Sequence, residues 1–193
     1  MFVILLTHAD ARMVEPRYAM RGLTEDGRKD VKRAAWRFRE LVPEIDPALH
    51  EKSLVIGKIV SSPLARCLET VIVFAKELSD FTKTSEIWVS ERLREKRGEQ
   101  LTADDLAAVV DEGEVAVMLL GTHGDLAGAL PCSAPLDRDK ENSEGKNLIQ
   151  GAWFGPRPVL VLVEHEPGVP WDSAQVLCCE YFNGSTWESL LEA

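Results

Sequence analysis

The sequence has few of the features that identify several classes of protein. Its four cysteines include no CxxC pair, so we expect no disulfide framework and predict a reduced, cytoplasmic environment. No basic segment precedes the apolar start Phe2–Leu6, and the longest apolar run, Val115–Leu120, is far shorter than the ~18 residues that cross a bilayer. We therefore expect neither a signal peptide nor a membrane partner.

Basic residues are also scarce. Lys and Arg number 22 against 32 Asp and Glu, which gives a formal net charge of −10. Such a surface repels nucleic-acid phosphates, so nucleic acid is not an expected partner, although a small basic pocket for one phosphate remains compatible with it. The sequence contains no GxGxxG motif, and Gly145-Lys146 lacks the other residues of a P-loop.

The residues that are present are those of a globular protein, 45% hydrophobic and 28% charged. The length of 193 residues predicts a single domain, 1–193, with a long polar loop at about 131–155. Short apolar runs alternate with helical periodicity. This alternation predicts an α/β fold: a three-layer α/β/α sandwich whose mostly parallel central sheet has an antiparallel edge and a C-terminal hairpin.

The periodicity also places the individual elements. Strands are expected at Phe2–Leu6, Lys58–Ser61, Glu86–Val89, Val115–Leu120 and Val159–Val163, with a hairpin over 175–190 that turns at Asn183-Gly184. Helices are expected over 24–42, 64–78 and 102–112. Thr24 is the predicted N-cap of the first helix, and Pro43 its predicted end. The inward residues expected for the second helix are Ala65, Leu68, Ile72, Ala75 and Leu78.

The sequence contains only four histidines, and two of them directly follow predicted strands: His8 and His123. The carboxyl ends of strands in open α/β sheets are where ligands bind, so both side chains should reach the same edge. Ser61 and Arg66 lie at another strand end and the helix turn that follows it. Imidazoles, a guanidinium and a helix N-terminus that converge in this way predict an anion site.

These segments resemble the motifs of the histidine phosphatase (phosphoglycerate mutase-like) superfamily, and in particular its small SixA-type phosphohistidine phosphatases. The resemblance covers roughly residues 2–130. The matching segments are Leu23-Thr24-Glu25-Asp26-Gly27, preceded by Arg21, then Ser61-Ser62-Pro63-Leu64-Ala65-Arg66 through Thr70, and Thr122-His123-Gly124. The family's Arg-His-Gly segment stands here as Thr7-His8-Ala9.

The resemblance implies a phosphatase that needs no metal and no cofactor. His8 would attack phosphorus and form a phosphohistidine, Arg66 and His123 would stabilise the phosphoryl oxygens, and Glu95 would exchange the proton. The implied substrate is a phosphomonoester or a phosphohistidine, in a phosphorylated small molecule or a phosphoprotein. Further residues expected to bind phosphate are Thr7, Ser61 and Arg21.

The sequence leaves several alternatives open. A neutral Thr7 replaces a charge-assisted hydrogen bond worth about 1.5–3 kcal/mol, which favours an impaired pseudophosphatase that binds a phosphorylated ligand or a protein partner. Substitutes for the missing guanidinium would come from Arg12, Arg17, Arg21, Arg94 or Arg97.

His165 also follows a predicted strand and competes with His123 for the place of the second site histidine. His123 is favoured because Gly124 follows it. A metal site would have to use residues whose spacing matches no common ligand pattern: His8, Asp10, His123, Asp125 and His165.

Overall fold

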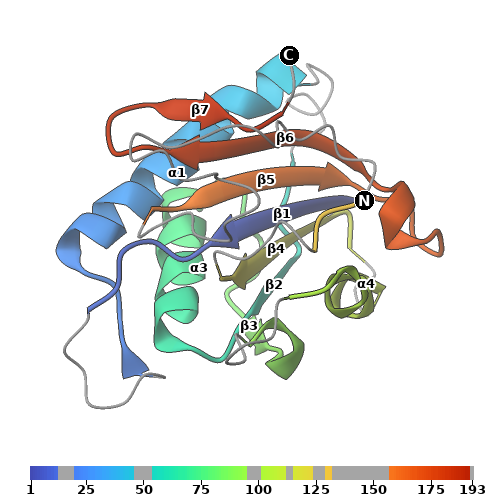
Figure 1. The fold of residues 1–193 in the computed structure, drawn as a ribbon, viewed down its shortest axis with the longest axis horizontal. Coiled ribbons are helices and arrows are strands. Elements are labelled where there is room, and N and C mark those ends of the chain that lie inside the picture. Colours follow the sequence, from blue (N-terminus) through green and yellow to red (C-terminus); the bar gives the residue numbers. More distant parts are fainter. Residues whose placement is uncertain are drawn as a thin grey trace.

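The computed structural model describes residues 1–12, 20–45, 54–94, 101–111, 115–123, 129–131 and 157–191. Within these residues, seven strands form one sheet in the order β3-β2-β4-β1-β5-β6-β7 (Figure 1). The strands are β1 Phe2–Thr7, β2 Lys58–Ser61, β3 Ile87–Val89, β4 Val117–Thr122, β5 Val159–Glu164, β6 Gln175–Phe182 and β7 Trp187–Ser189. The predicted α/β fold is confirmed, while nearly all of the predicted loop, from residue 132 onward, lies outside the described residues.

The sheet divides into a parallel part and an antiparallel part. Strands β3, β2, β4 and β1 run in the same direction. Strand β5 pairs antiparallel with β1, and β6 and β7 continue the antiparallel pairing. The arrowheads of β1 and β4 therefore point to one edge of the sheet, and that of β5 points to the opposite edge, where the N-terminus lies (Figure 1).

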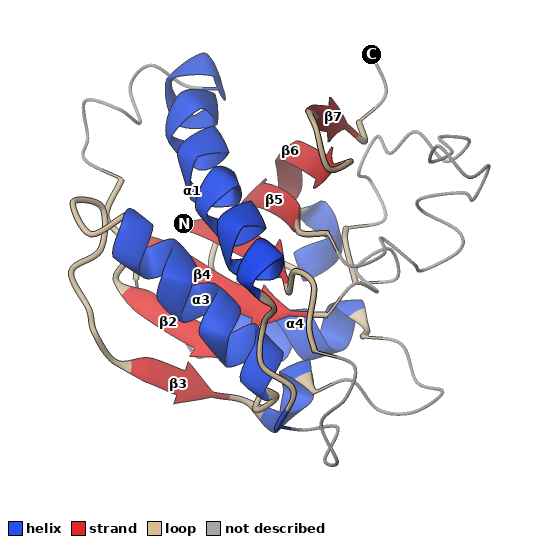
Figure 2. Ribbon diagram, turned by 90° about the vertical axis from the view of Figure 1, so that its left-hand side faces the viewer, coloured by secondary structure: helices blue, strands red, loops and turns tan. Residues whose placement is uncertain are grey.

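Helices cover both faces of the sheet (Figure 2). Helices α1 (Glu25–Ile45) and α3 (Ala65–Glu77) pack on one face, where Phe38 and Phe74 are fully or almost fully buried. Helix α4 (Ala103–Asp111) covers the other face through Leu106 and Val109. The predicted three layers are thus confirmed. In the described part of the chain, no helix is long and apolar enough to span a membrane.

Helix α1 begins as predicted but ends later. The Gly27 N–H donates to Thr24 Oγ1 at 2.9 Å, which is the expected N-cap hydrogen bond. The prediction that Pro43 ends the helix is wrong, because the helix continues to Ile45. The buried Leu41 and Val42 anchor this last turn on the core, which offsets the hydrogen bond that proline cannot donate.

The inward face predicted for α3 is confirmed only in part, since Leu78 is fully buried but Ile72 is not. Ile72 is 49% exposed, whereas the buried residues are Arg66, Cys67, Thr70, Val71 and Phe74. The helix carries two apolar stripes, and the one that buries the large Phe74 ring faces the sheet. This rotation also turns the polar Arg66 and Thr70 inward, so the helix brings a guanidinium into the interior.

The C-terminal hairpin is confirmed, with its turn displaced by one residue. The Asn183 N–H donates to the Thr186 carbonyl at 3.1 Å, so these two residues flank the turn. Gly184 lies at its centre with a φ of 103°, a conformation that glycine adopts without steric cost. The Asn183 side chain accepts hydrogen bonds from the Ser185 and Thr186 N–H groups, which explains why asparagine precedes the turn instead of entering it.

Candidate active site

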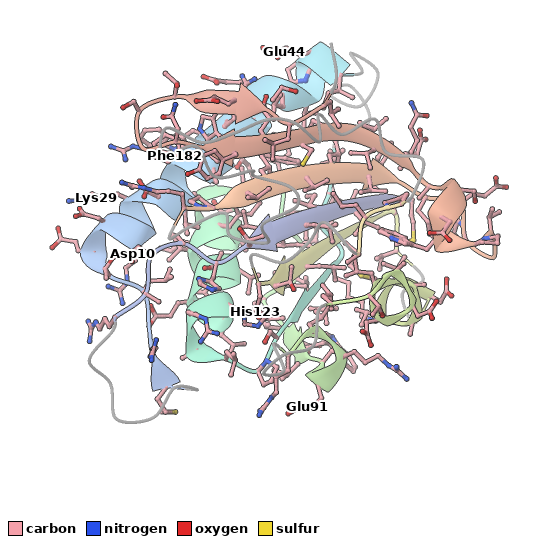
Figure 3. All side chains as sticks on the ribbon, in the orientation of Figure 1. Asp10, Lys29, Glu44, Glu91, His123 and Phe182 are labelled. Atoms are coloured by element: carbon pink, nitrogen blue, oxygen red, sulfur yellow. The ribbon has the colours of Figure 1, made fainter. Side chains whose placement is uncertain are left out.

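Three parallel strands end side by side at one edge of the sheet and deliver polar residues there. His8 follows β1, Ser62 follows β2 and His123 follows β4. Backbone pairing continues past the strand ends, since the His8 N–H donates to the Thr122 carbonyl at 3.0 Å and the Ser62 N–H to the Gly121 carbonyl at 2.9 Å. Figure 3 shows His123 at this edge. The predicted convergence of His8 and His123 is confirmed: their ring centroids are 5.6 Å apart.

His8 is oriented by the carbonyl of the next residue. Its Nδ1 lies 2.8 Å from the Ala9 carbonyl oxygen. Because a carbonyl can only accept, Nδ1 carries a proton, and in the neutral ring Nε2 therefore carries the lone pair. The ring is half-buried and stands nearly perpendicular to that of His123, at 74°. In this tautomer Nε2 is the ring atom with a lone pair, as nucleophilic attack requires.

His123 is 5% exposed and lies among groups from two other elements. Its Nε2 is 2.9 Å from Ser62 Oγ, and its Nδ1 is 3.4 Å from Arg66 Nη2. The Cys67 sulfur lies 3.5 Å from Nε2. Burial, and to a lesser extent the charge that His8 carries when protonated and the charge of Arg66, lower the pKa of His123 to about 3. The ring is therefore neutral at neutral pH.

Arg66 comes from the first turn of α3 and is only 2% exposed. Thr70 Oγ1 donates to the Arg66 carbonyl at 2.8 Å and thereby ties this turn to the next one. The neighbouring carboxylate of Glu69 is engaged elsewhere, because it accepts from the Leu23 N–H at 2.8 Å and from Arg28 at 2.9 Å. A buried guanidinium in contact with His123 provides positive charge for an anion at this edge.

The other predicted phosphate-binding residues have identifiable positions. Thr7 is fully buried, and its Oγ1 accepts the Val159 N–H at 2.7 Å. The Ser61 hydroxyl donates to the Ser62 carbonyl at 2.9 Å. Arg21 is half-buried and adjoins Gly22, whose carbonyl accepts the Arg12 N–H at 3.0 Å. Both hydroxyls thus bond to the backbone, and binding of phosphate by these three residues stays a prediction.

The structure does not describe the predicted proton donor or two of the arginines expected to substitute for the missing guanidinium. Glu95, the expected proton donor, lies outside the described residues, as do Arg17 and Arg97. Arg94 is described, and its Nε bonds to Glu91 at 2.7 Å.

The sequence did not predict the contact of Ser62 with His123. Its position directly after a strand, in the same segment as Arg66, was the available signal.

His165 lies at the opposite edge of the sheet. It follows β5, which runs antiparallel to β1, so it lies beside the N-terminus: the Met1 ammonium donates to the His165 carbonyl at 2.6 Å. Its ring is 5.3 Å from that of Trp171. His123 is therefore the histidine that accompanies His8, as favoured from the sequence. Within the described ranges, no three His, Cys, Asp or Glu residues gather as a metal site.

Comparison with known proteins identifies the fold. No protein-family model and no curated protein match the sequence. The structure of the protein histidine phosphatase SixA complexed with tungstate aligns over 98% of this chain and 97% of its own, with a TM-score of 0.56 and 17% identity. A SixA structure from Nakamurella multipartitia aligns over 94% and 96%, with a TM-score of 0.55 and 17% identity.

A mycobacterial glucosyl-3-phosphoglycerate phosphatase complexed with VO3 aligns over 99% of this chain and 98% of its own, with a TM-score of 0.51 and 16% identity. The chain thus has the phosphoglycerate mutase-like fold of these phosphatases. At such identities the similarity establishes the fold, and the function has to be inferred from the residues at the sheet edge.

Proposed function

We propose that this protein is a histidine phosphatase that hydrolyses a phosphomonoester or a phosphohistidine through a phospho-His8 intermediate. The observation that carries the proposal is the orientation of His8, whose Nε2 has the lone pair and whose ring adjoins that of His123, which in turn contacts the buried Arg66. The fold supports it, because the SixA structure of similar fold holds tungstate and the glucosyl-3-phosphoglycerate phosphatase holds VO3. The substrate would be a phosphorylated small molecule or a phosphoprotein.

The reaction proceeds in two displacements at phosphorus. In the first, the Nε2–P bond forms as the bond to the leaving oxygen or nitrogen breaks, and Glu95 supplies the proton that the leaving atom takes up. In the second, water attacks phosphorus, its proton passes to Glu95, and the Nε2–P bond breaks to release phosphate. Arg66 stabilises the negative oxygens in both transition states. This role of Glu95 is the one that the family resemblance implies.

Thr7 favours a second candidate function. It stands where the family pattern has arginine, and its Oγ1 accepts a backbone N–H from β5. A site with one positive charge fewer stabilises the transition state less, while Arg66 still attracts an anion. The second candidate is therefore a pseudophosphatase that binds a phosphorylated ligand or partner.

The proposed location of the protein is the cytoplasm for either function. The described cysteines form no disulfide, which supports this location: Cys67, Cys178 and Cys179.

Hydrolysis of an aryl phosphate by the wild type and by His8→Ala tests the proposal. We expect turnover in the wild type and a loss of about 10³-fold or more in His8→Ala, because the nucleophile is removed. The matched control is His165→Asn, which changes a buried histidine at the opposite edge and should keep the activity. Equal rates for wild type and His8→Ala would refute the intermediate. Tungstate binding without turnover in the wild type would identify the pseudophosphatase.

A further inference from the structure

The imidazole of His123 lies between two groups whose chemistry fixes where its proton sits. A guanidinium has only donors, so the 3.4 Å contact of Arg66 Nη2 with Nδ1 requires a lone pair on Nδ1. The proton of the neutral ring then lies on Nε2, which is 2.9 Å from Ser62 Oγ. The Ser62 oxygen accepts this proton, so the ring is the Nε2–H tautomer.

We propose that Ser62 is a positioning residue that holds His123 as the Nε2–H tautomer with Nδ1 directed to Arg66, so that an arriving phosphoryl anion binds together with a proton. The inference rests on the proposed function and adds a residue to that site. Ser62 itself need not touch the substrate. It acts through the ring of His123.

Ser62 is suited to this role because its own position is rigid. It is fully buried, and its N–H donates to the Gly121 carbonyl at 2.9 Å, next to the strand end that carries His123. Its Oγ also accepts the Leu64 N–H at 3.5 Å, where the chain turns into α3. The hydroxyl oxygen is thereby fixed relative to both β4 and α3, and the imidazole that bonds to it is fixed as well.

The surroundings of the ring explain why a proton must accompany the anion. In the described part of the chain, the ionisable groups that face the ring are His8 after β1 and Arg66 and Cys67 on α3. Burial, the charge that His8 carries when protonated and the charge of Arg66 lower the pKa of His123, so the ring is neutral while no anion is bound. In this state Nδ1 is an acceptor, like the phosphoryl oxygens, and cannot bond to them.

A bound dianion reverses this preference. Its negative charge stabilises the imidazolium, and a proton added at Nδ1 turns that atom from an acceptor into a donor toward a phosphoryl oxygen. The Nε2–H bond to Ser62 is kept throughout. Arg66 then directs its Nη2 to the anion instead of to Nδ1. Binding should therefore take up a proton when the pH is well above the pKa of unliganded His123.

The tautomer is measurable by long-range ¹H–¹⁵N NMR of the imidazole in the anion-free protein. We expect the wild type to show the Nε2–H form at neutral pH. Ser62→Ala should lower the ratio of Nε2–H to Nδ1–H by about tenfold, the equivalent of one lost hydrogen bond, and Ser62→Thr should restore it. An Nδ1–H form in the wild type, or an unchanged ratio in Ser62→Ala, would overturn the proposal.

Calorimetric titration with tungstate in buffers of different ionisation enthalpy separates this inference from the proposed function. Tungstate remains a dianion at neutral pH, so proton uptake on binding is assigned to the protein. We expect uptake approaching one proton per anion. Binding without uptake would overturn the proton-linked step while leaving a phosphate site intact. Failure to bind tungstate would contradict the phosphate site itself, whereas the NMR result would still decide the role of Ser62.

Discussion

At the scale of single residues, Thr7 bears most directly on whether the site can hydrolyse a phosphorylated substrate. It immediately precedes His8, and its Oγ1 accepts the N–H of Val159, the first residue of β5. This hydrogen bond joins the end of β1 to the start of the antiparallel strand beside it. Thr7 therefore holds the backbone from which His8 emerges. Unlike an arginine, it offers no positive charge to a phosphoryl group.

Replacement of Thr7 by valine should destabilise the fold measurably. Valine keeps the shape but leaves the Val159 N–H without its acceptor in a buried position, which should lower the free energy of unfolding by about 1–3 kcal/mol. Thr7→Ser is the matched control: it keeps the hydroxyl and loses one methyl, at a cost of about 1 kcal/mol. Urea denaturation measures both changes, and wild-type stability in Thr7→Val would contradict this role.

At the scale of elements, the site depends on how closely α3 approaches β4. A Cβ on Gly121 would lie 2.3 Å from Val71 Cγ1 and 3.3 Å from the Cys67 carbonyl oxygen. Only a residue without a side chain allows α3 to lie this close to the strand. The close approach brings Arg66 to within 3.4 Å of His123, although 57 residues separate them in the sequence. Gly121 thus sets the spacing between the helix and the strand that form the site.

Gly121→Ala should push α3 away from β4 and weaken both the fold and the anion site. We expect a loss of stability of about 1–3 kcal/mol from overpacking, together with weaker tungstate binding. Val71→Ala removes the Cγ1 atom that the new methyl meets, so the cost of Gly121→Ala should be smaller in that background. Unfolding and tungstate titrations of the four proteins measure this coupling. Additive costs would show that Val71 is not the obstacle.

The sequence predicts the elements better than their orientation. The N-cap at Thr24 and the C-terminal hairpin both depend on local hydrogen bonds, and the structure contains them. The inward face of α3 depends instead on which of two apolar stripes meets the sheet. The edge to which His165 is carried depends on the direction of β5, which an evenly apolar run does not encode. The contact of Ser62 with His123 spans 61 residues and requires both strands to be placed.

At the scale of the whole molecule, the mixed sheet separates two buried histidines to opposite edges. His123 is 5% exposed beside His8 and Arg66, and His165 is 2% exposed beside Trp171 and the N-terminus. In the described part of this acidic chain, whose net charge is −10, the buried guanidinium of Arg66 and the two site imidazoles lie at the same edge. Such a local positive site within an acidic surface suits a single phosphoryl group better than a polyanion.

The burial of His123 makes the stability of the whole molecule depend on pH. In the unfolded chain a histidine titrates near 6.5, whereas in the folded protein the pKa of His123 is lowered to about 3. Between these values the unfolded state binds more protons, so stability falls as the pH decreases from 6.5 toward 3. One such group contributes a slope of at most about 1.4 kcal/mol per pH unit.

Urea unfolding of the wild type and of His123→Asn over this pH range isolates the contribution of this one histidine. Asparagine does not titrate, so the variant should lose stability less steeply as the pH falls below 6.5, whatever its stability at neutral pH. Carboxylates that protonate in the same range affect both proteins equally and cancel in the difference. Parallel pH dependences would show that His123 accepts its proton as readily in the folded protein as in the unfolded chain, and that its burial has no electrostatic cost.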